Sequence, residues 1–244
     1  MIQAQLQATP DGAILFDAGA LAQADFDPAY FEPAYWHARG QAQAASAGRG
    51  GASYIDAPFG RCVLRHYRRG GMVARVMGDR YLWTGAQRTR GFAEFRLLSI
   101  LRERNLHVPA PVAARYRRKG AHYRADLITR RIDAATTLAE LLAQQRTDAQ
   151  IAAQVGAAIA GFHAQGAYHA DLNAHNVLLA GAAVWLIDFD RGELRAPARD
   201  WQQANLARLR RSLLKLGAAR DGELRFESAM WRPLMAAYER GSAT

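Results

Sequence analysis

Two aspartates and an asparagine at fixed spacings constrain this chain more than any other feature of its sequence. Residues 169–176 read His-Ala-Asp-Leu-Asn-Ala-His-Asn, so Asp171 stands five residues before Asn176. Asp188 follows Asn176 by twelve residues, directly after the apolar run 184–187. Phosphoryl transfer from a metal-bound nucleotide needs such a set, because one carboxylate orients the attacking hydroxyl while a carboxamide and a second carboxylate hold Mg²⁺. We therefore expect Asp171 to be catalytic, and Asn176 and Asp188 to be metal ligands.

The other polar residues of segment 169–176, called the catalytic loop below, are expected to support it. Each Asp or Asn alone is also an ordinary turn residue, and only the joint spacing favours catalysis. His169 should fix the loop by packing and hydrogen bonding, and Asn173 should bond the loop backbone or the substrate. His175 is not an expected ligand, because Mg²⁺ prefers oxygen. His163, in the preceding helical segment, is interpreted as a core histidine.

Hydrophobic periodicity predicts many strands in the first half of the chain. Hairpins are expected over residues 54–67 and 112–129, with a helix over residues 92–101 between them. Residues 1–47 contain an apolar run at 13–16 and an aromatic stretch at 30–36, which predicts a short helix.

The second half of the chain is predicted to be mainly helical. Helices are expected over 137–145 and 149–165, a small hairpin over 177–187, and helical structure from Leu194 onward. This order predicts an α+β fold with an N-terminal extension and β-rich nucleotide-binding lobe at 1–131, carrying one main helix, and a helical catalytic lobe at 132–244. Together with the catalytic loop and Asp188, it resembles the bilobal protein-kinase-like fold.

That resemblance implies a basic residue on a strand, paired with a glutamate on a helix, to bind the nucleotide phosphates. No lysine precedes Lys119, and the strand pattern at 62–67 places Arg65 in this position, with Val63 on the same face by the two-residue period. Glu94, in the helix predicted at 92–101, is the expected partner. An ordinary surface arginine and a solvated glutamate are the alternative. Arg68 and Arg69 are rivals for the phosphate-binding role, but they stand where the strand should end.

A glycine-rich segment precedes these strands. Gly48, Gly50 and Gly51 are candidates for a loop that covers the phosphates, because glycine lets backbone N–H groups approach a ligand closely. A flexible surface turn is an equally good interpretation of this segment.

The net charge of +10 predicts an anionic partner. Only Lys119 and Lys215 are lysines, so the remaining basic residues are arginines, which suit bidentate contact with phosphate. Codon bias is the alternative explanation for this composition. Cys62 is the only cysteine and the first residues carry no positive charge, so neither an internal disulfide nor a secretory signal is expected.

The segment after Asp188 is short. No Ala-Pro-Glu sequence follows it, and Asp200 comes only twelve residues later. This leaves no room for a long peptide-docking loop, which argues against a regulated protein kinase and favours a small-molecule or glycolipid kinase. Asp200 is expected to anchor the catalytic loop from a helix.

With these residues identified, the sequence resembles the lipopolysaccharide kinases, and among them the 3-deoxy-D-manno-octulosonic acid (Kdo) kinases. The resemblance covers residues 48–216, and its most specific part is the run Leu-Arg-His-Tyr-Arg-Arg-Gly-Gly at 64–71. It implies ATP and Mg²⁺ as cofactors and phosphorylation of the 4-hydroxyl group of a Kdo sugar on a lipid A precursor. It also implies a peripheral location on the cytoplasmic face of a bacterial inner membrane. Neither a nucleic-acid nor a protein partner is implied.

Residues 201–216 allow two interpretations. Leu206, Leu209, Leu213 and Leu216 form one apolar stripe of a helix whose other faces carry basic residues. Such a helix can lie on an anionic membrane. A core helix with a solvated basic face is the favoured interpretation.

Other functions remain open at this stage. A heptose kinase of the lipopolysaccharide core and a RIO-like atypical protein kinase both share the catalytic loop. An aminoglycoside kinase needs an acidic pocket, which the net charge of +10 opposes. A non-catalytic module that binds nucleic acid or membrane is opposed by the joint presence of Asp171, Asn176 and Asp188.

Overall fold

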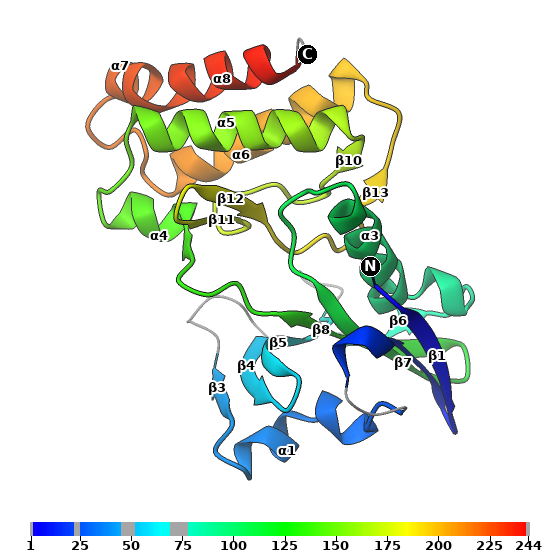
Figure 1. The fold of residues 1–244 in the computed structure, drawn as a ribbon. Coiled ribbons are helices and arrows are strands. Elements are labelled where there is room, and N and C mark those ends of the chain that lie inside the picture. Colours follow the sequence, from blue (N-terminus) through cyan, green and yellow to red (C-terminus); the bar gives the residue numbers. More distant parts are fainter. Residues whose placement is uncertain (1, 22–24, 45–51, 69–77, 243–244) are drawn as a thin grey trace. The chain divides into compact units, whose positions relative to one another are not determined.

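The computed structural model describes residues 2–21, 25–44, 52–68 and 78–242, which belong to two compact units (Figure 1). The first unit comprises Met1–Ser99 and Pro109–Arg131, and the second comprises Ile100–Val108 and Ile132–Thr244. This division differs from the predicted lobes in one segment, 100–108, which belongs to the second unit. The element content confirms the predicted α+β fold class.

An antiparallel sheet is the framework of the first unit. Its strands are β1 (Ala4–Thr9), β2 (Gly12–Asp17), β3 (Ala42–Ala44), β4 (Ala52–Ala57), β5 (Gly60–His66), β6 (Tyr81–Leu82), β7 (Pro111–Lys119) and β8 (His122–Arg130). Among the described residues, the order is β1-β2-β7-β8-β5-β4-β3, and β6 also pairs with β8. The predicted hairpins β4–β5 and β7–β8 are confirmed. Gly120 closes the second one with φ of +60°, a left-handed conformation that glycine adopts without steric cost.

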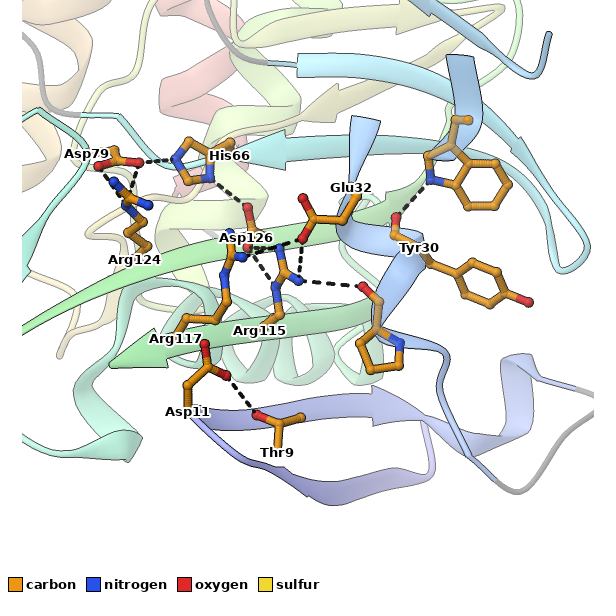
Figure 2. A network of polar contacts seen from close by, with 12 residues as sticks. Thr9, Asp11, Tyr30, Glu32, His66, Asp79, Arg115, Arg117, Arg124 and Asp126 are labelled. Atoms are coloured by element: carbon orange, nitrogen blue, oxygen red, sulfur yellow. Dashed lines mark hydrogen bonds and ion pairs between the residues drawn. The ribbon is translucent and has the colours of Figure 1, made fainter. Parts of the chain in front are cut away.

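The N-terminal region is part of this core, which sequence patterns did not reveal. Strand β2 pairs with β7, and its Ile14 and Phe16 are buried in one apolar cluster with Trp36. The aromatic stretch forms the short helices η2 (Pro28–Phe31) and α1 (Pro33–His37), which confirms the predicted helix; the turn η1 (Ala18–Ala20) precedes them. The Trp36 indole donates a hydrogen bond of 2.8 Å to the Tyr30 carbonyl oxygen (Figure 2).

The predicted helix between the two hairpins is α3 (Arg90–Glu103), preceded by the turn η3 (Ala86–Arg88). Phe92, Phe95 and Leu98 are fully buried on one side of it. Glu94 lies in the same helix and is also buried, although it is charged. A buried carboxylate needs a partner that donates a hydrogen bond or carries a positive charge.

The second unit is mainly helical. Its elements are β9 (Thr136–Thr137), α4 (Leu138–Ala143), α5 (Ala149–Ala164), β10 (Ala167–Tyr168), β11 (Val177–Ala180), β12 (Ala183–Leu186), β13 (Glu193–Leu194), α6 (Arg199–Lys215), α7 (Glu223–Phe226), η4 (Glu227–Trp231, a π-helical turn) and α8 (Arg232–Ser242). Helices α4 and α5 and the hairpin β11–β12 confirm their predictions. Thr137 and Glu140 form a capping box at α4, and the Asp148 side chain caps α5 by accepting a hydrogen bond from the Ile151 N–H.

The prediction of helical structure from Leu194 onward placed the beginning of the helix too early. Residues 193–194 form strand β13, which pairs with β10, and α6 begins at Arg199. The reason is Pro197, because a proline restricts the residue before it to extended conformations. Ala198 is also extended, with φ of −150°.

The apolar stripe of α6 is buried inside the second unit. Leu206, Leu209 and Leu213 are at most 1% exposed, whereas Leu216, just beyond the helix, is 40% exposed. This confirms the core-helix interpretation, because a buried stripe cannot insert into a membrane. Within the described residues, no helix has both the length and the apolar character that crossing a bilayer requires.

Gly156 sets the distance between α5 and α8, which lie side by side (Figure 1). A Cβ atom at this position would lie 2.0 Å from the Leu234 carbonyl oxygen. Substitution Gly156→Ala is therefore expected to lower the free energy of unfolding by about 1–3 kcal/mol, measured by denaturant titration. Gly161→Ala in the same helix is the matched control, because its Cβ meets nothing within 4 Å. The control should be neutral or stabilising, and equal losses in the two variants would contradict the close approach.

Candidate active site

The catalytic loop connects β10 to β11 in the second unit. The Asn176 Nδ2 donates to the Asp171 carbonyl oxygen at 3.0 Å, and the Asn173 Nδ2 donates to the same oxygen at 3.1 Å. Asn173 also donates to the Asp171 carboxylate at 3.0 Å. These bonds bring the predicted catalytic carboxylate and the predicted metal-binding carboxamide into one tight loop. The Asp171 side chain is 56% exposed and Asn176 is buried.

His169 fixes the start of this loop, as predicted. Its Nε2 lies 2.9 Å from the Ile187 carbonyl oxygen, and its Nδ1 lies 3.1 Å from the Asp171 backbone nitrogen. A carbonyl oxygen can only accept and a backbone N–H can only donate, so Nε2 carries the proton and the ring is neutral. Burial lowers the pKa of His169, which stabilises the same neutral form.

Asn205 on α6 anchors the catalytic loop, and Asp200 does not. The Asn205 side chain accepts from the His169 N–H at 3.3 Å and donates to the His169 carbonyl oxygen at 3.0 Å. Asp200 is exposed, and its carboxylate accepts from the Trp201 N–H at the first turn of α6. Asn205 precedes Leu209 by one helical turn and therefore lies on the apolar stripe of the helix. A polar residue in that stripe is the sequence signal that could have identified Asn205 as the anchor.

Asp188 lies two residues beyond the end of β12, in a strained backbone conformation. Its φ of +63° is uncommon for any residue except glycine, although Asp and Asn tolerate it better than others. The preceding Ile187 N–H donates to the Asn176 carbonyl oxygen at 3.0 Å, which places the two predicted metal ligands on adjacent segments. The next residue, Phe189, is buried with its ring centroid 4.6 Å from that of His169. Strained residues of this kind cluster at functional sites.

Arg208 is a residue of this site that sequence reasoning missed. Its Nη1 lies 3.4 Å from the Asp171 Oδ1, and both side chains are exposed. One turn further along α6, the Ser212 hydroxyl accepts from the Ala174 N–H at 3.1 Å. Asn205, Arg208 and Ser212 are spaced by three and four residues, so they share one face of the helix. That face contacts the catalytic loop along its length.

In the first unit, the expected pair between Arg65 and Glu94 is present. The Arg65 guanidinium on β5 forms an ion pair with the buried Glu94 carboxylate of α3. Tyr67 completes the cluster, because its hydroxyl donates to Glu94 at 2.6 Å and accepts from Arg65 at 3.1 Å. Tyr67 was not predicted, although it stands two residues after Arg65 and so follows the same alternation.

Of the other residues predicted to bind or contact the nucleotide, the structure describes some and leaves others outside the described ranges. Val63 lies on β5 and is partly buried, two residues before Arg65. The rival Arg68 is exposed beyond the end of β5, whereas Arg65 pairs with Glu94. Several predicted positions lie outside the described residues: Gly48, Gly50, Gly51 and Arg69.

Beside Arg65, His66 belongs to a network of charged side chains (Figure 2). Its Nδ1 lies 2.6 Å from the Asp126 carboxylate and its Nε2 lies 2.9 Å from that of Asp79. Both nitrogens face acceptors, which favours the imidazolium and raises the pKa of His66, chiefly through the hydrogen bond to Asp126. The second Asp126 oxygen accepts from the buried Arg115 at 2.9 Å, and Arg115 also reaches Glu32 at 2.8 Å. The network joins β5, β7 and β8 to the N-terminal region.

Comparisons with known proteins identify the family of this chain. The model of the lipopolysaccharide kinase (Kdo/WaaP) family matches residues 33–238. A protein of Xanthomonas campestris pv. campestris (strain B100) named 3-deoxy-D-manno-octulosonic acid kinase is 52% identical over 219 residues, covering 87% of this chain and 84% of its own. A protein of the same name from Stenotrophomonas maltophilia (strain R551-3) is 50% identical over 215 residues, with the same coverage. A solved structure of WaaP in complex with acyl carrier protein matches with 17% identity and a TM-score of 0.49, over 89% of this chain and 92% of that one. The chain belongs to the lipopolysaccharide kinase (Kdo/WaaP) family.

Proposed function

We propose that this protein transfers the γ-phosphoryl group of ATP to the 4-hydroxyl group of a Kdo sugar on a lipid A precursor. The observation that carries the proposal is the catalytic loop, in which Asn173 restrains the exposed Asp171 carboxylate and the buried Asn176 carboxamide bonds the Asp171 carbonyl oxygen. The names of the two relatives, which are about half identical to this chain, support Kdo as the acceptor.

Asp171 is the proposed catalytic residue. Its carboxylate is exposed, so an acceptor hydroxyl can approach it, and it is restrained by Asn173 at 3.0 Å and Arg208 at 3.4 Å. A carboxylate fixed in this way can orient the hydroxyl and accept its proton as the oxygen–phosphorus bond forms. The phosphoryl group then passes from ATP to the sugar, and ADP leaves.

Asp188 and Asn176 are the proposed ligands of Mg²⁺. Their donor atoms are oxygens, which this hard cation prefers. The Asn176 amide nitrogen is engaged by the Asp171 carbonyl oxygen, which leaves the amide oxygen as the donor for a metal. The left-handed backbone of Asp188 is the local strain that a ligand position can require. When bound, the ion neutralises negative charge on the nucleotide phosphates.

Arg65 is the proposed contact to the ATP phosphates, in place of a lysine. Glu94 and Tyr67 fix the guanidinium from α3 and from the end of β5. Because arginine stays charged at every physiological pH, this contact cannot be lost by deprotonation. Val63 and the glycine-rich segment with Gly48, Gly50 and Gly51 complete the proposed nucleotide site.

Substitution Arg65→Ala is expected to raise the KM for ATP by about 10–100-fold, the usual range for a charge-assisted hydrogen bond. The KM for the acceptor should not change. Steady-state kinetics with varied ATP measures the effect, and thermal unfolding reports any cost of removing the ion pair of Glu94 with Arg65. Arg68→Ala is the control, because Arg68 is exposed beyond the strand. An unchanged KM for ATP in the Arg65 variant contradicts the assignment.

We further propose that the enzyme acts as a peripheral protein at the cytoplasmic face of the inner membrane of a Gram-negative bacterium. The net charge of +10 supports this location, because the membrane surface and the lipid acceptor are both anionic. Fractionation at low and high salt tests it: membrane association should fall as salt rises, and salt-independent partition would oppose it.

The experiment that tests the function supplies labelled ATP and Mg²⁺ with a panel of acceptors. The panel contains a Kdo-bearing lipid A precursor, the same lipid without Kdo, a heptose-bearing core and a generic protein. Label on the Kdo lipid alone, lost on chelation and restored by Mg²⁺, is the expected result. Label on the heptose core or on the protein would be consistent with the assigned catalytic residues but would contradict Kdo as the acceptor. No transfer to any acceptor overturns the enzyme assignment.

A further inference from the structure

Helix α6 presents three basic side chains next to the catalytic loop. Arg208, Arg211 and Lys215 are exposed and are spaced by three and four residues, so they form one stripe on the helix, called the basic stripe here. At 1.5 Å per residue, the stripe is about 10 Å long. It begins at Arg208, whose guanidinium lies 3.4 Å from the Asp171 carboxylate. It runs beside Ser212, which holds the catalytic loop.

Two of the three residues of the basic stripe, Arg211 and Lys215, carry charge that no described carboxylate neutralises. In the described part of the chain, the ion pairs of α6 are those of Arg208 with Asp171 and of Arg210 with Glu223 and Glu227, and none involves Arg211 or Lys215. Arg210 lies about 100° around the helix from Arg211. The charge of Arg210 is therefore neutralised by glutamates of the protein, whereas Arg211 and Lys215 keep their charge on the face of α6 that also carries Arg208.

We infer that Arg211 and Lys215 bind the anionic groups of the acceptor and that Arg208 couples this site to Asp171. The inference rests on the proposed function and adds to it the residues that select the substrate. A Kdo-bearing lipid A precursor offers a sugar carboxylate and lipid phosphates, and guanidinium and ammonium groups bind both. The length of the stripe exceeds one sugar ring, which places Lys215 for a phosphate of the lipid and Arg211 nearer the sugar carboxylate.

Arg208 has a positioning role in this arrangement. It contacts Asp171 on one side and adjoins the basic stripe on the other, so an acceptor anion and the catalytic carboxylate share one cation. Substitution Arg208→Gln should lower kcat about 10-fold and raise the acceptor KM less than that, because the lost contact orients the base. Arg208→Lys should restore part of kcat, since it keeps the charge but loses the planar fork.

The test compares Arg211→Gln, Lys215→Gln and the double variant with Arg210→Gln, the matched control on the same helix. The assay uses the full-length protein with the Kdo-bearing lipid A precursor in neutral detergent micelles. The double variant should raise the acceptor KM about 10-fold, with kcat and the KM for ATP within about 2-fold of the unsubstituted protein. Arg210→Gln should leave all three constants unchanged.

A second acceptor, the same lipid with its phosphates removed, separates the two contacts. The effect of Lys215→Gln should disappear with this lipid, and that of Arg211→Gln should persist. An unchanged acceptor KM in the double variant, with full activity of the unsubstituted protein, overturns the inference alone. Effects seen only on anionic vesicles, and absent in neutral micelles, also overturn it, because the stripe would then bind the bilayer. No turnover by the unsubstituted protein overturns the proposed function instead.

Discussion

Replacement of Asp171 by asparagine is expected to lower kcat by about 10²–10⁴-fold, with little change in the KM for ATP. The carboxylate is exposed and restrained by two neighbours, so its loss removes the proton acceptor without disturbing the core. Asparagine keeps the size of the side chain, and the Asp171 carbonyl oxygen still accepts from Asn176. Single-turnover kinetics with saturating ATP and acceptor measures the chemical step directly.

His175→Ala is the control for this prediction. His175 is an exposed neighbour in the same loop, and its side chain has no proposed role. The variant should retain nearly full kcat and the same thermal unfolding midpoint. If Asp171→Asn keeps more than about one tenth of kcat, Asp171 is not the general base. Unchanged binding of a lipid with no turnover in either protein would instead favour a non-catalytic module.

Substitution Asp126→Asn is expected to lower the free energy of unfolding by about 3–5 kcal/mol, the usual cost of breaking a buried ion pair. The Asp126 carboxylate accepts from Arg115 on one side and lies 2.6 Å from His66 on the other. Asp126 and Arg115 are both less than 5% exposed. An amide in this position leaves the guanidinium buried without a full countercharge. Denaturant titration measures the loss.

The control for this second prediction is Asp79→Asn, at the exposed end of the same network. The Asp79 side chain is 25% exposed and contacts Arg124, which is 49% exposed. Its loss should cost about 1 kcal/mol or less, because water screens the pair. Similar losses in the two variants would show that burial of Asp126 does not determine the cost.

The network also predicts how stability depends on pH. The hydrogen bond to Asp126 raises the pKa of His66 in the folded protein above the ordinary value of about 6.5 that applies to the unfolded chain. The resulting stabilisation is therefore fully present below about pH 6.5 and is lost as the pH rises through the raised pKa. Unfolding free energies measured from pH 6 to 9 should show this decline. In the Asp126→Asn variant, the decline in unfolding free energy between pH 6 and 9 should be smaller.

Features that depend on near neighbours in the chain were predictable. The β4–β5 and β7–β8 hairpins and helix α3 follow from alternation, periodicity and turn residues, which act within a few residues. The catalytic loop was predictable for the same reason, because the hydrogen bonds between its own residues join positions at most five apart. The Arg65–Glu94 pair was predicted only through the resemblance to kinases, since 29 positions separate its members.

Features that depend on packing between distant segments were not predictable. Asn205, Arg208 and Ser212 lie more than 35 positions from their partners in the catalytic loop, and nothing local marks that contact. The pairing of β2 with β7 is of the same kind. Asp200 was wrongly chosen as the anchor because an aspartate in this region was expected to reach the loop, whereas in the first turn of a helix it caps its own backbone.

The contacts of His169 have a consequence for how the enzyme responds to acidity. Main-chain groups occupy both ring nitrogens, one as donor and one as acceptor, and the buried ring has a lowered pKa. The side chain thus serves as an electrically neutral spacer that neither takes up nor releases a proton near neutral pH. The catalytic loop should keep one shape across the range of pH found in a cell. Any change of rate in that range would then originate in the reacting groups and not in the scaffold that holds them.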